Sequence, residues 1–379
     1  MGASVAYHLA TRGVRDVVLV EREPMLGSGA TGRCAGGVRL QFSHESNIRL
    51  SLESIDVLER FEDEVGQRID FHQDGYLFLL SSPASVEDFR RNAELQRRLD
   101  VPVEWLDAEE ARQLAPGIAS DDVLAATFCG RDGIADPNGV TMGFAKAAQA
   151  LGVEIVRETE VTAVALEGGR IARVETSRGP IATETLVNAA GPWARRIGAM
   201  VGLDVPVEPV RRHIFIADVP TDPQGTALNA RRSPSSRVLV IDFETSFYFH
   251  RESTGVLFGM GDPEEPPGFD QSVNWDFLER VTPVATKRLP VLADANITKA
   301  WAGLYEMSPD AMPIIGPARQ VPGFHLITGF SGHGFQHSPA AGRILADVIT
   351  GRDHGGIDLT PFQFERFDGR PLAGEGNVV

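Results

Sequence analysis

The chain has 379 residues, of which 42% are hydrophobic and 23% charged, which is an ordinary globular balance. A chain of this length is too long for one core and suggests two domains. Its net charge of −16 disfavours nucleic acid as a main partner. Two cysteines, Cys34 and Cys129, exclude a disulfide framework and favour a cytoplasmic location, and the absence of any apolar run near 18 residues predicts no membrane span.

The start of the chain predicts a helix, a turn and a buried strand. Residues 3–12 have a helical composition, and the β-branched run 16–21 is typical of a parallel strand. A dinucleotide fingerprint places G-x-G-x-x-G between a first strand and such a helix, with an acid about 20 residues further on. If Gly2 is the third glycine, Glu21 is that acid. We therefore expect Met1 to be internal to a longer natural chain that supplies the first strand; the alternative is a real truncation with weakened cofactor binding.

The middle of the chain alternates between two kinds of pattern. The stretch 27–37 has five glycines in eleven residues, which indicates a loop where backbone closely approaches another group. Residues 207–260 contain short strands with alternating or β-branched patterns, typical of an antiparallel block. The other expected elements are helices over 46–65 and 85–99, a strand over 76–80, a turn, helix and strand over 133–156, a hairpin over 160–177 and a strand within 185–194.

Segments of βα type thus stand at the start, middle and end of the chain and surround the antiparallel segments. This order predicts an α/β fold in which a discontinuous, Rossmann-like dinucleotide-binding domain carries an inserted antiparallel-sheet substrate domain. The expected binding domain comprises residues 1–75, 133–205 and 296–379, and the expected substrate domain comprises residues 76–132 and 206–295.

The stretch GFSGHGFQHSPAAG, residues 329–342, carries the strongest chemical signal. Its glycines form a permissive loop that we expect to feed a helix starting near Ser338–Pro339. The N-terminus of such a helix offers free N–H donors and a partial positive charge, which would stabilise an anionic reduced flavin. A βα unit without a ligand is the structural alternative. In LVNAAGPWA, the small residues after Asn188 would let backbone pass close to a nucleotide.

A family resemblance emerges from the order of these motifs. The helix and strand that end at Glu21 are followed by GRCAGGVR, VNAAGPW, GLYEMSPDAMPIIGP and GFSGHGFQHSPAAG. In this order they resemble FAD-dependent amine oxidoreductases of the D-amino-acid oxidase and sarcosine oxidase type, over nearly the whole chain. The likeness is greatest to the beta subunits of heteromeric sarcosine oxidase and proline dehydrogenase.

The resemblance implies FAD as the cofactor and a small amine or amino acid as the substrate, sarcosine-, glycine- or proline-like. A hydride would pass to flavin N5, the imine would then hydrolyse, and oxygen or a partner subunit would accept the electrons. Glu21 would bind the adenosine ribose, Gly2 would belong to the pyrophosphate loop, and Val161 would hold the adenine through its backbone. The whole implied cofactor set is Gly2, Glu21, Arg22, Ser28, Thr31, Gly32, Arg33, Val161, Ala190, Gly191, Gly329, Ser331, Gly332, His333, Gly334, Phe335 and Gln336.

Amino-acid oxidation also needs a clamp for the substrate's carboxylate, for which arginine offers a bidentate fork. The candidates are Arg39, Tyr248 and Tyr305, while His333 in the flavin loop could orient or tune the site. Arg39 could instead be a surface ion-pair partner. Tyr248 could be an ordinary face of its strand, and His44 could simply start a helix.

The mode of flavin attachment and the rival functions follow from what the sequence lacks. Gly303 stands where monomeric sarcosine oxidases carry a flavin-tethering cysteine, so the resemblance implies non-covalent FAD. Scattered histidines disfavour a metal site, and a serine hydrolase would need G-x-S-x-G. An NAD dehydrogenase would share the start but would not need the C-terminal glycine loop. A non-catalytic FAD-holding scaffold or assembly factor is the alternative from another class.

Overall fold

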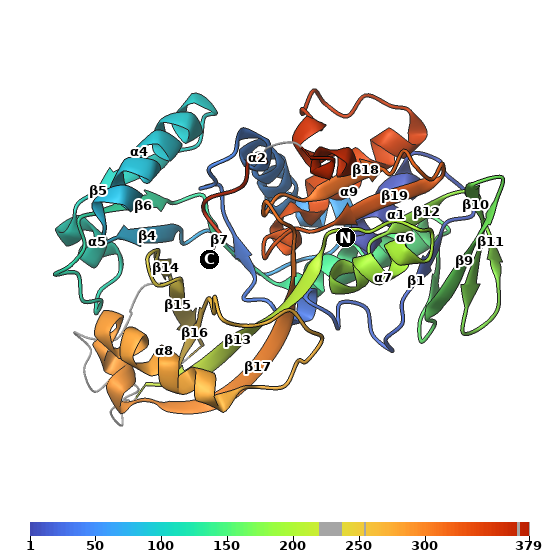
Figure 1. The fold of residues 1–379 in the computed structure, drawn as a ribbon. Coiled ribbons are helices and arrows are strands. Elements are labelled where there is room, and N and C mark those ends of the chain that lie inside the picture. Colours follow the sequence, from blue (N-terminus) through green and yellow to red (C-terminus); the bar gives the residue numbers. More distant parts are fainter. Residues whose placement is uncertain (220–236, 254, 370–371, 379) are drawn as a thin grey trace.

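The computed structural model describes residues 1–219, 237–253, 255–369 and 372–378, and Figure 1 shows their two main parts. A large sheet with helices on its faces lies to the left in this view. Smaller sheets with the helices α1, α6 and α9 lie to the right, and an antiparallel hairpin sheet forms the right-hand edge. Among the described residues, no helix is both long and apolar enough to cross a membrane.

The right-hand part contains the βα segments expected from the sequence. Two parallel strand pairs form its centre, and an antiparallel strand extends one of them. In the described chain no strand lies between β1 and β12, so each has an open edge. The elements are α1 (Gly2–Thr11), β1 (Val18–Val20), α6 (Pro137–Ala150), β8 (Glu154–Val156), β12 (Leu186–Asn188), α7 (Ala194–Ala199), β18 (Ile314–Pro317), β19 (Phe324–Thr328) and α9 (Gly334–Thr350).

Two small sheets and two helices complete this part. One sheet has the order β11-β10-β9 and contains the expected hairpin, and the other has the order β2-β7-β3. Helix α2 begins after His44, whose Nδ1 accepts a hydrogen bond of 3.2 Å from the N–H of Ser46, so His44 is the helix-start residue. The bounds are β2 (Gly37–Val38), α2 (Glu45–Glu59), α3 (Phe61–Val65), β3 (Phe71–His72), β7 (Gly133–Ala135), β9 (Val161–Glu167), β10 (Arg170–Thr176) and β11 (Ile181–Ala182).

The left-hand part is built on an eight-stranded sheet in the order β17-β13-β16-β15-β14-β4-β6-β5. Its strands and helices are β4 (Tyr76–Leu80), α4 (Pro83–Arg98), β5 (Val103–Leu106), α5 (Ala108–Leu114), β6 (Ala125–Cys129), β13 (Glu208–Asp218), β14 (Leu239–Asp242), β15 (Phe247–Glu252), β16 (Gly255–Met260), α8 (Trp275–Arg288) and β17 (Asn296–Met307). Its core joins α8 to the sheet through buried side chains that include Phe215, Phe247, Phe258 and Phe277.

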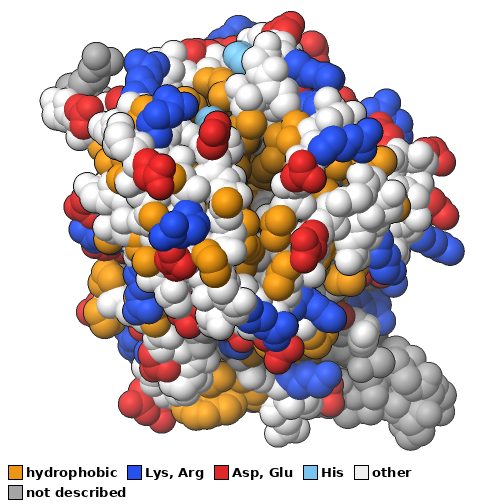
Figure 2. All heavy atoms as spheres, turned by 90° about the vertical axis from the view of Figure 1, so that its right-hand side faces the viewer, with side chains coloured by type: hydrophobic (Ala, Val, Ile, Leu, Met, Phe, Trp, Pro, Cys, Tyr) orange, Lys and Arg blue, Asp and Glu red, His pale blue; other side chains and the backbone are white. Residues whose placement is uncertain are grey.

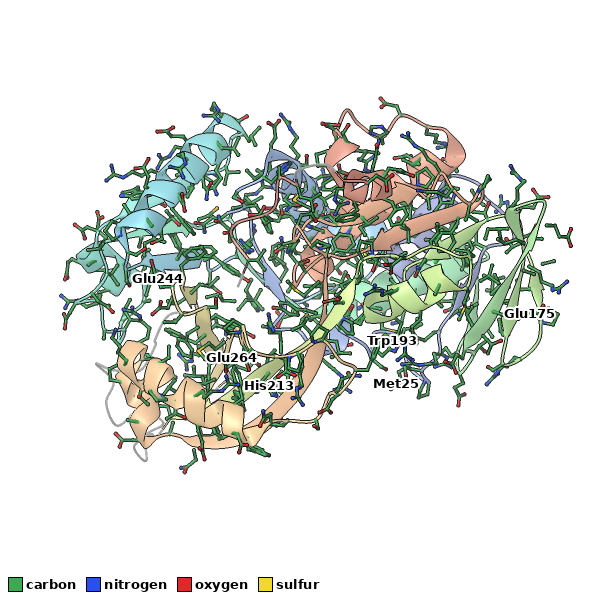
Figure 3. The ribbon with its side chains drawn as sticks, in the orientation of Figure 1. Met25, Glu175, Trp193, His213, Glu244 and Glu264 are labelled. Atoms are coloured by element: carbon green, nitrogen blue, oxygen red, sulfur yellow. The ribbon has the colours of Figure 1, made fainter. Side chains whose placement is uncertain are left out.

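The sheet is mixed rather than purely antiparallel, which corrects one expectation. β4 and β14 pair in parallel, because they come from segments far apart in the chain and no hairpin joins them. Glu244, at the left of Figure 3, reinforces this junction by accepting hydrogen bonds from the N–H groups of Ser81 and Ser82 at 3.0 and 2.9 Å. β17 lies in the third segment assigned to the cofactor domain, yet it pairs with β13 of this sheet. The domain division therefore stays a proposal.

The last helix begins earlier than expected. α9 starts at Gly334, and Pro339 lies inside it rather than at its first turn. The reason is the loop before it: Gly329, Ser331 and Gly332 take positive φ values of 74°, 49° and 99°, which turn the chain so that the helix can begin directly after His333. The N-terminus of α9 thus lies inside the glycine-rich motif itself.

Candidate functional site

A cavity of about 1220 Å³ runs between the two parts of the molecule. Sites for one drug-sized ligand usually measure about 300–1,000 Å³, so this one has room for a dinucleotide and a small substrate. Part of its volume lies between the open edges of β1 and β12, whose residues line it. Figure 2 shows a hollow in the face that lies to the right in Figure 1, with hydrophobic side chains along its walls and charged ones around it.

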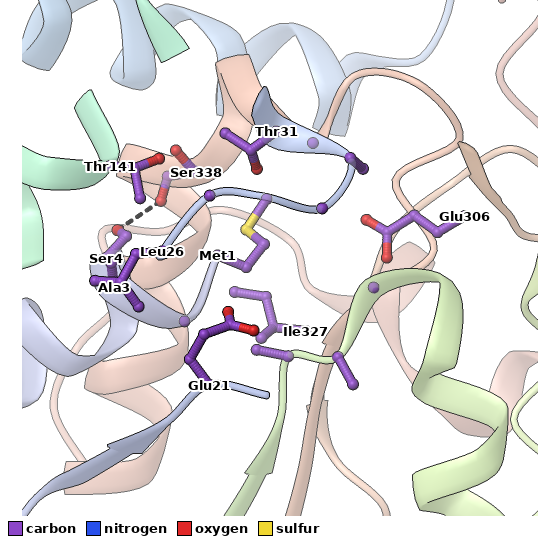
Figure 4. Close-up of a pocket in the computed structure, with 18 of the residues that line it drawn as sticks. Met1, Ala3, Ser4, Glu21, Leu26, Thr31, Thr141, Glu306, Ile327 and Ser338 are labelled. Carbon is purple, nitrogen blue, oxygen red and sulfur yellow. Dashed lines mark hydrogen bonds between the residues drawn. The ribbon is translucent and has the colours of Figure 1, made fainter. Parts of the chain in front are cut away.

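One end of the cavity is formed by the start of α1 and the end of β1. No side chain caps the N-terminus of α1, so its first N–H groups are free for an anion. Gly2 keeps this approach tight, since a Cβ there would lie 3.1 Å from Leu19. Ser4 donates a hydrogen bond of 2.7 Å to the carbonyl of Ser338, which ties α1 to α9 (Figure 4).

Glu21 follows β1 and points into the cavity, as Figure 4 shows. One of its carboxylate oxygens accepts a hydrogen bond of 2.8 Å from the N–H of Glu23, which fixes the side chain. Burial raises the pKa of Glu21, with opposing contributions from the backbone N–H groups. The other oxygen is available to accept hydrogen bonds from ribose hydroxyls, the role that the family resemblance implies.

The start of α9 forms the central wall. This helix has 17 residues, and no side chain caps its N-terminus. Gly332 must be glycine here, because a Cβ would lie 2.4 Å from the ring of Tyr305 and the φ of 99° is unfavourable for other residues. The absence of a side chain at Gly332 therefore lets the backbone of this loop lie against the Tyr305 ring. A carbonyl or anion placed before α9 would meet free N–H groups.

Two histidines at this wall are neutral. Burial lowers the pKa of His333 well below its ordinary value, and burial lowers that of His337 to about 3. The rings lie 5.1 Å apart, and His337 Nε2 bonds to Ser51 Oγ at 2.7 Å. His333 lines the cavity, and its Nε2 has no hydrogen-bond partner among the described residues. It therefore presents a neutral imidazole to the bound molecule, with no charge of its own.

The other end of the cavity is lined by tyrosines and arginines. Tyr248 and Tyr305 both face it, and burial raises the pKa of each phenol. Strand alternation places Phe247 and Phe249, the neighbours of Tyr248, in the core of the large sheet. Tyr248 therefore lies on the opposite face of β15, which lines the cavity. Protonated phenols in this position can donate hydrogen bonds to a carboxylate.

Arg39 is buried rather than a surface ion-pair partner, so that alternative is wrong. It is 6% exposed, and its guanidinium lies 4.0 Å from the centre of the Phe42 ring. Its two terminal nitrogens donate to the carbonyls of Gln41 at 2.8 Å and Asn377 at 2.5 Å. In the described chain no carboxylate lies within 4.0 Å of it, and burial lowers its pKa. Arg39 lines the cavity, and the carboxylates of Glu375 and Asp132 interact with its charge from beyond 4.0 Å.

Arg212 was missed in the sequence, although it is the freer of the two arginines. Its guanidinium lies 5.3 Å from the centre of the Tyr305 ring, and its Nε is buried without a partner among the described residues. Arg212 and Ile214 line the cavity, whereas Arg211 points to the other face of β13 and pairs with Glu265 at 3.0 Å. The period-2 alternation of this strand was the signal that could have separated the two arginines.

Glu306 is a second missed residue, within a motif that had been noticed for its tyrosine. Its carboxylate accepts a hydrogen bond of 2.8 Å from Thr328, and burial raises its pKa. A Cβ on Gly191 or Gly334 would lie 3.6 or 3.4 Å from its oxygens, so Glu306 stands where two glycine turns meet. Figure 4 shows it across the cavity from Glu21. It can bond a hydroxyl group between the two ends of the cavity.

The structure brings together most residues that the sequence singled out. Gly32 and Gly329 are the exceptions, since neither lines the cavity. A Cβ on Gly32 would lie 2.4 Å from the carbonyl of Gly27, so Gly32 closes a tight turn instead. The predicted residues that line the cavity are Gly2, Glu21, Arg22, Ser28, Thr31, Arg33, Arg39, Val161, Ala190, Gly191, Tyr248, Tyr305, Ser331, Gly332, His333, Gly334, Phe335 and Gln336.

These features fit FAD. Two uncapped helix N-termini open on the cavity, one suited to the pyrophosphate and one to the pyrimidine edge of the flavin. Glu21 lies at the end where the ribose is expected, and Gly332 leaves space for a flat ring. No group of metal-ligating side chains comes together among the described residues.

Comparisons with known proteins give the same family. The family model "FAD dependent oxidoreductase" matches residues 1–348. Dimethylglycine dehydrogenase of Rattus norvegicus mitochondria is 33% identical over 366 residues, an alignment that covers 92% of this chain and 42% of that protein. FAD-dependent oxidoreductase domain-containing protein 1 of Xenopus laevis is 30% identical, with coverage of 100% and 83%. The crystal structure of L-proline dehydrogenase from P. horikoshii has a TM-score of 0.87 at 32% identity, with coverage of 98% and 96%.

The extent of these matches differs between relatives. The chain spans about two fifths of the length of the dimethylglycine dehydrogenases that it matches, and nearly the whole of the proline dehydrogenase chain. The structural match to the proline dehydrogenase covers 98% of this chain, so it extends over both the small parallel sheets and the large mixed sheet.

Proposed function

The chain belongs to the family of FAD-dependent oxidoreductases and its cofactor is FAD, and on that premise we propose that it oxidises a small amino acid at the C–N bond. The substrate would be a primary, secondary or tertiary amine that carries a carboxylate, in the range of glycine, sarcosine, proline and N,N-dimethylglycine. When bound, FAD supplies the acceptor for the hydride equivalent. The imine product then hydrolyses in water.

The observation that carries this proposal is the cation-rich, tyrosine-lined end of the cavity. Arg212 presents a partly buried guanidinium whose Nε has no partner among the described residues, and Tyr305 and Tyr248 line the same cavity. A carboxylate bound there gains charge-assisted hydrogen bonds in a site largely shielded from water. The amine of the same molecule would then point toward the wall formed by the start of α9.

The substrate amine must also lose its proton before it can be oxidised. Hydride loss requires a neutral amine, and a cationic site favours that form because it raises the free energy of an ammonium ion. Arg212 and Arg39 provide two positive charges, while His333 is neutral and adds none. We therefore propose that the substrate amine is deprotonated on binding through this electrostatic effect, with no side chain acting as a strong base.

Non-covalent attachment of FAD is part of the proposal. A side chain at Gly303 would have its Cβ 3.0 Å from the Cβ of Arg33, which leaves little room for a tethering cysteine. Cys34 lines the cavity, but burial raises the pKa of its thiol to about 11, and the thiol donates to the carbonyl of Thr31 at 3.1 Å. A thiol at this position is a poor nucleophile. Mass spectrometry of acid-denatured protein should show the unmodified chain, and a flavin adduct would contradict this.

The test of the function is anaerobic bleaching of the bound flavin. Sarcosine, N,N-dimethylglycine, glycine and L-proline would be mixed with the FAD-loaded protein, and loss of the oxidised flavin absorption would be followed. We expect at least one to bleach it and the corresponding carboxamide to do so far more slowly. A flavin that none of them reduces would favour the scaffold function. The electron acceptor, oxygen or a partner, follows from the rate of reoxidation in air.

The expected cytoplasmic location stays a prediction, because the relatives named above include a mitochondrial enzyme.

A further inference from the structure

The segment 372–378 does not lie on the surface as a loose end but packs against the substrate end of the cavity. Figure 1 marks the C-terminal end of the chain near β7, inside the outline of the molecule. Glu375 and Asn377 are 7% and 2% exposed, and Val378 lines the cavity. The contacts of this segment join parts of the chain that are more than 300 residues away in sequence.

Glu375 fastens the segment to the start of α2. Its carboxylate accepts hydrogen bonds from Ser43 N and Oγ at 2.7 and 2.6 Å, and from His44 N at 3.2 Å. It also accepts from Asn47 Nδ2 at 3.0 Å and from Asn377 N at 3.0 Å. Five donors on one carboxylate make a rigid attachment, and the positive end of the α2 dipole favours its charge.

Asn377 links the anchored segment to Arg39. Its carbonyl accepts a hydrogen bond of 2.5 Å from the Arg39 guanidinium, and its side-chain amide donates to the carbonyl of Gln41 at 3.2 Å. Arg39 Nη1 donates to that same Gln41 carbonyl at 2.8 Å. The segment and the strand-like stretch 39–42 are therefore joined in one network. The direction of the Arg39 guanidinium depends on it.

We propose that the segment 372–378 is a positioning element of the substrate site, in which Glu375 anchors Asn377 so that Asn377 holds the Arg39 guanidinium toward the bound carboxylate. This rests on the proposed function only in that the ligand carries a carboxylate. Glu375 and Asn377 act through Arg39 and do not touch the reacting atoms. Loss of the anchor would let the guanidinium turn away and weaken carboxylate binding, while Gln336 would still hold the Arg39 main chain and leave the FAD site intact.

The test compares a carboxylate with its neutral counterpart. Calorimetric titration of the FAD-loaded protein with propionate and with propionamide gives the carboxylate preference without turnover. We expect Glu375→Ala to weaken propionate binding about 10-fold and Asn377→Ala about 3-fold, with propionamide and FAD affinities within about 2-fold of wild type. Leu372→Ala, at an exposed side chain of the same segment, is the control and should bind all three as wild type does.

Each result decides the matter. An unchanged propionate preference in both variants overturns the proposal, and so does a wild type that shows no preference. Equal loss for propionate and propionamide would mean a merely structural role, which also overturns it. If the preference falls as expected but no amino acid bleaches the flavin, the positioning role stands and the proposed oxidation fails. Should Glu375→Ala not fold, Asn377→Ala alone still decides, because it removes only two side-chain hydrogen bonds.

Discussion

The two ends of the cavity differ in the chemical groups that line them. The proposed cofactor end is rich in main-chain groups: helix N-termini whose N-cap residues make no side-chain cap, glycines at positive φ, and beside them the carboxylate of Glu21. The proposed substrate end consists of side chains, chiefly the buried Arg39 and the partly buried Arg212, Tyr248 and Tyr305. Apart from Glu21, whose pKa is raised by burial, the main-chain end depends on backbone space rather than on charged side chains. The side-chain end holds charges away from water, so single substitutions there should have the larger effects on binding.

We expect the largest effect from replacement of Arg212, which should impair substrate binding at the substrate end alone. Arg212→Met keeps most of the volume but removes the guanidinium, so kcat/KM for the best amino acid should fall about 100-fold to 1,000-fold, equivalent to about 3–4 kcal/mol. FAD affinity should not change. Steady-state kinetics measures kcat/KM, and flavin fluorescence measures FAD affinity.

Arg211→Met is the matched control for this prediction. Arg211 is the neighbour on β13, and it pairs with Glu265 and Asp270 at 3.0 and 2.6 Å on the opposite face. Its loss should lower the melting temperature and leave KM near the wild-type value. If both variants lose kcat/KM equally, Arg212 has no special role in the clamp.

Gly332→Ala should weaken cofactor binding through backbone strain and steric overlap rather than through a change of charge. Its Cβ would lie 2.4 Å from the Tyr305 ring at a φ of 99°, so the loop before α9 must shift. We expect FAD binding to weaken about 10-fold to 100-fold, measured by fluorescence on titration of the apoprotein. Gly168→Ala is the control, with a φ of 57° but nothing within 4 Å of the added Cβ. Equal FAD affinity in both variants would contradict the close approach.

The same division explains what could be predicted from the sequence. Glycine motifs, a helix and an acid after a strand are local patterns, so Glu21, Gly191 and the loop before α9 could be identified from neighbouring residues alone. The substrate end depends on long-range pairing: Arg212 comes from β13, and its partner ring, Tyr305, comes from β17, which pairs with it at a separation of about 90 residues. The parallel pairing of β4 with β14 and the packing of Glu375 were missed for the same reason.

Glu21→Gln should have a smaller effect on FAD affinity than Gly332→Ala, again at the cofactor end. The amide keeps the shape but loses the charge and one acceptor, so FAD should bind about 10-fold more weakly, since a hydrogen bond to a charged group contributes about 1.5–3 kcal/mol. kcat at saturating FAD should stay near wild type. Glu175→Gln, on the outer hairpin sheet in Figure 3, is the control and should leave FAD affinity unchanged. A kcat loss in Glu21→Gln would instead place Glu21 near the chemistry.

The dependence of stability on pH, rather than a binding affinity, tests whether the substrate end carries an ionisation cost. Asp132 lies behind Arg39, is fully buried, and accepts hydrogen bonds from Leu40 N at 2.7 Å and Gln41 Nε2 at 3.0 Å. Burial raises its pKa to about 7, above the ordinary value of about 3.9. Between these values the folded state holds a proton that the unfolded state releases, so this group's contribution to the free energy of unfolding falls as pH rises from about 4 to about 7.

Asp132→Asn removes that contribution. The free energy of unfolding of the variant minus that of the wild type should therefore rise with pH across this window, by at most about 4 kcal/mol, and stay constant above pH 7. Buried histidines such as His337, with a pKa lowered to about 3, give the opposite slope below about pH 6.5, but they are present in both proteins and cancel in the difference. Urea unfolding at several pH values measures it. A difference that does not change with pH would show that Asp132 carries no such cost.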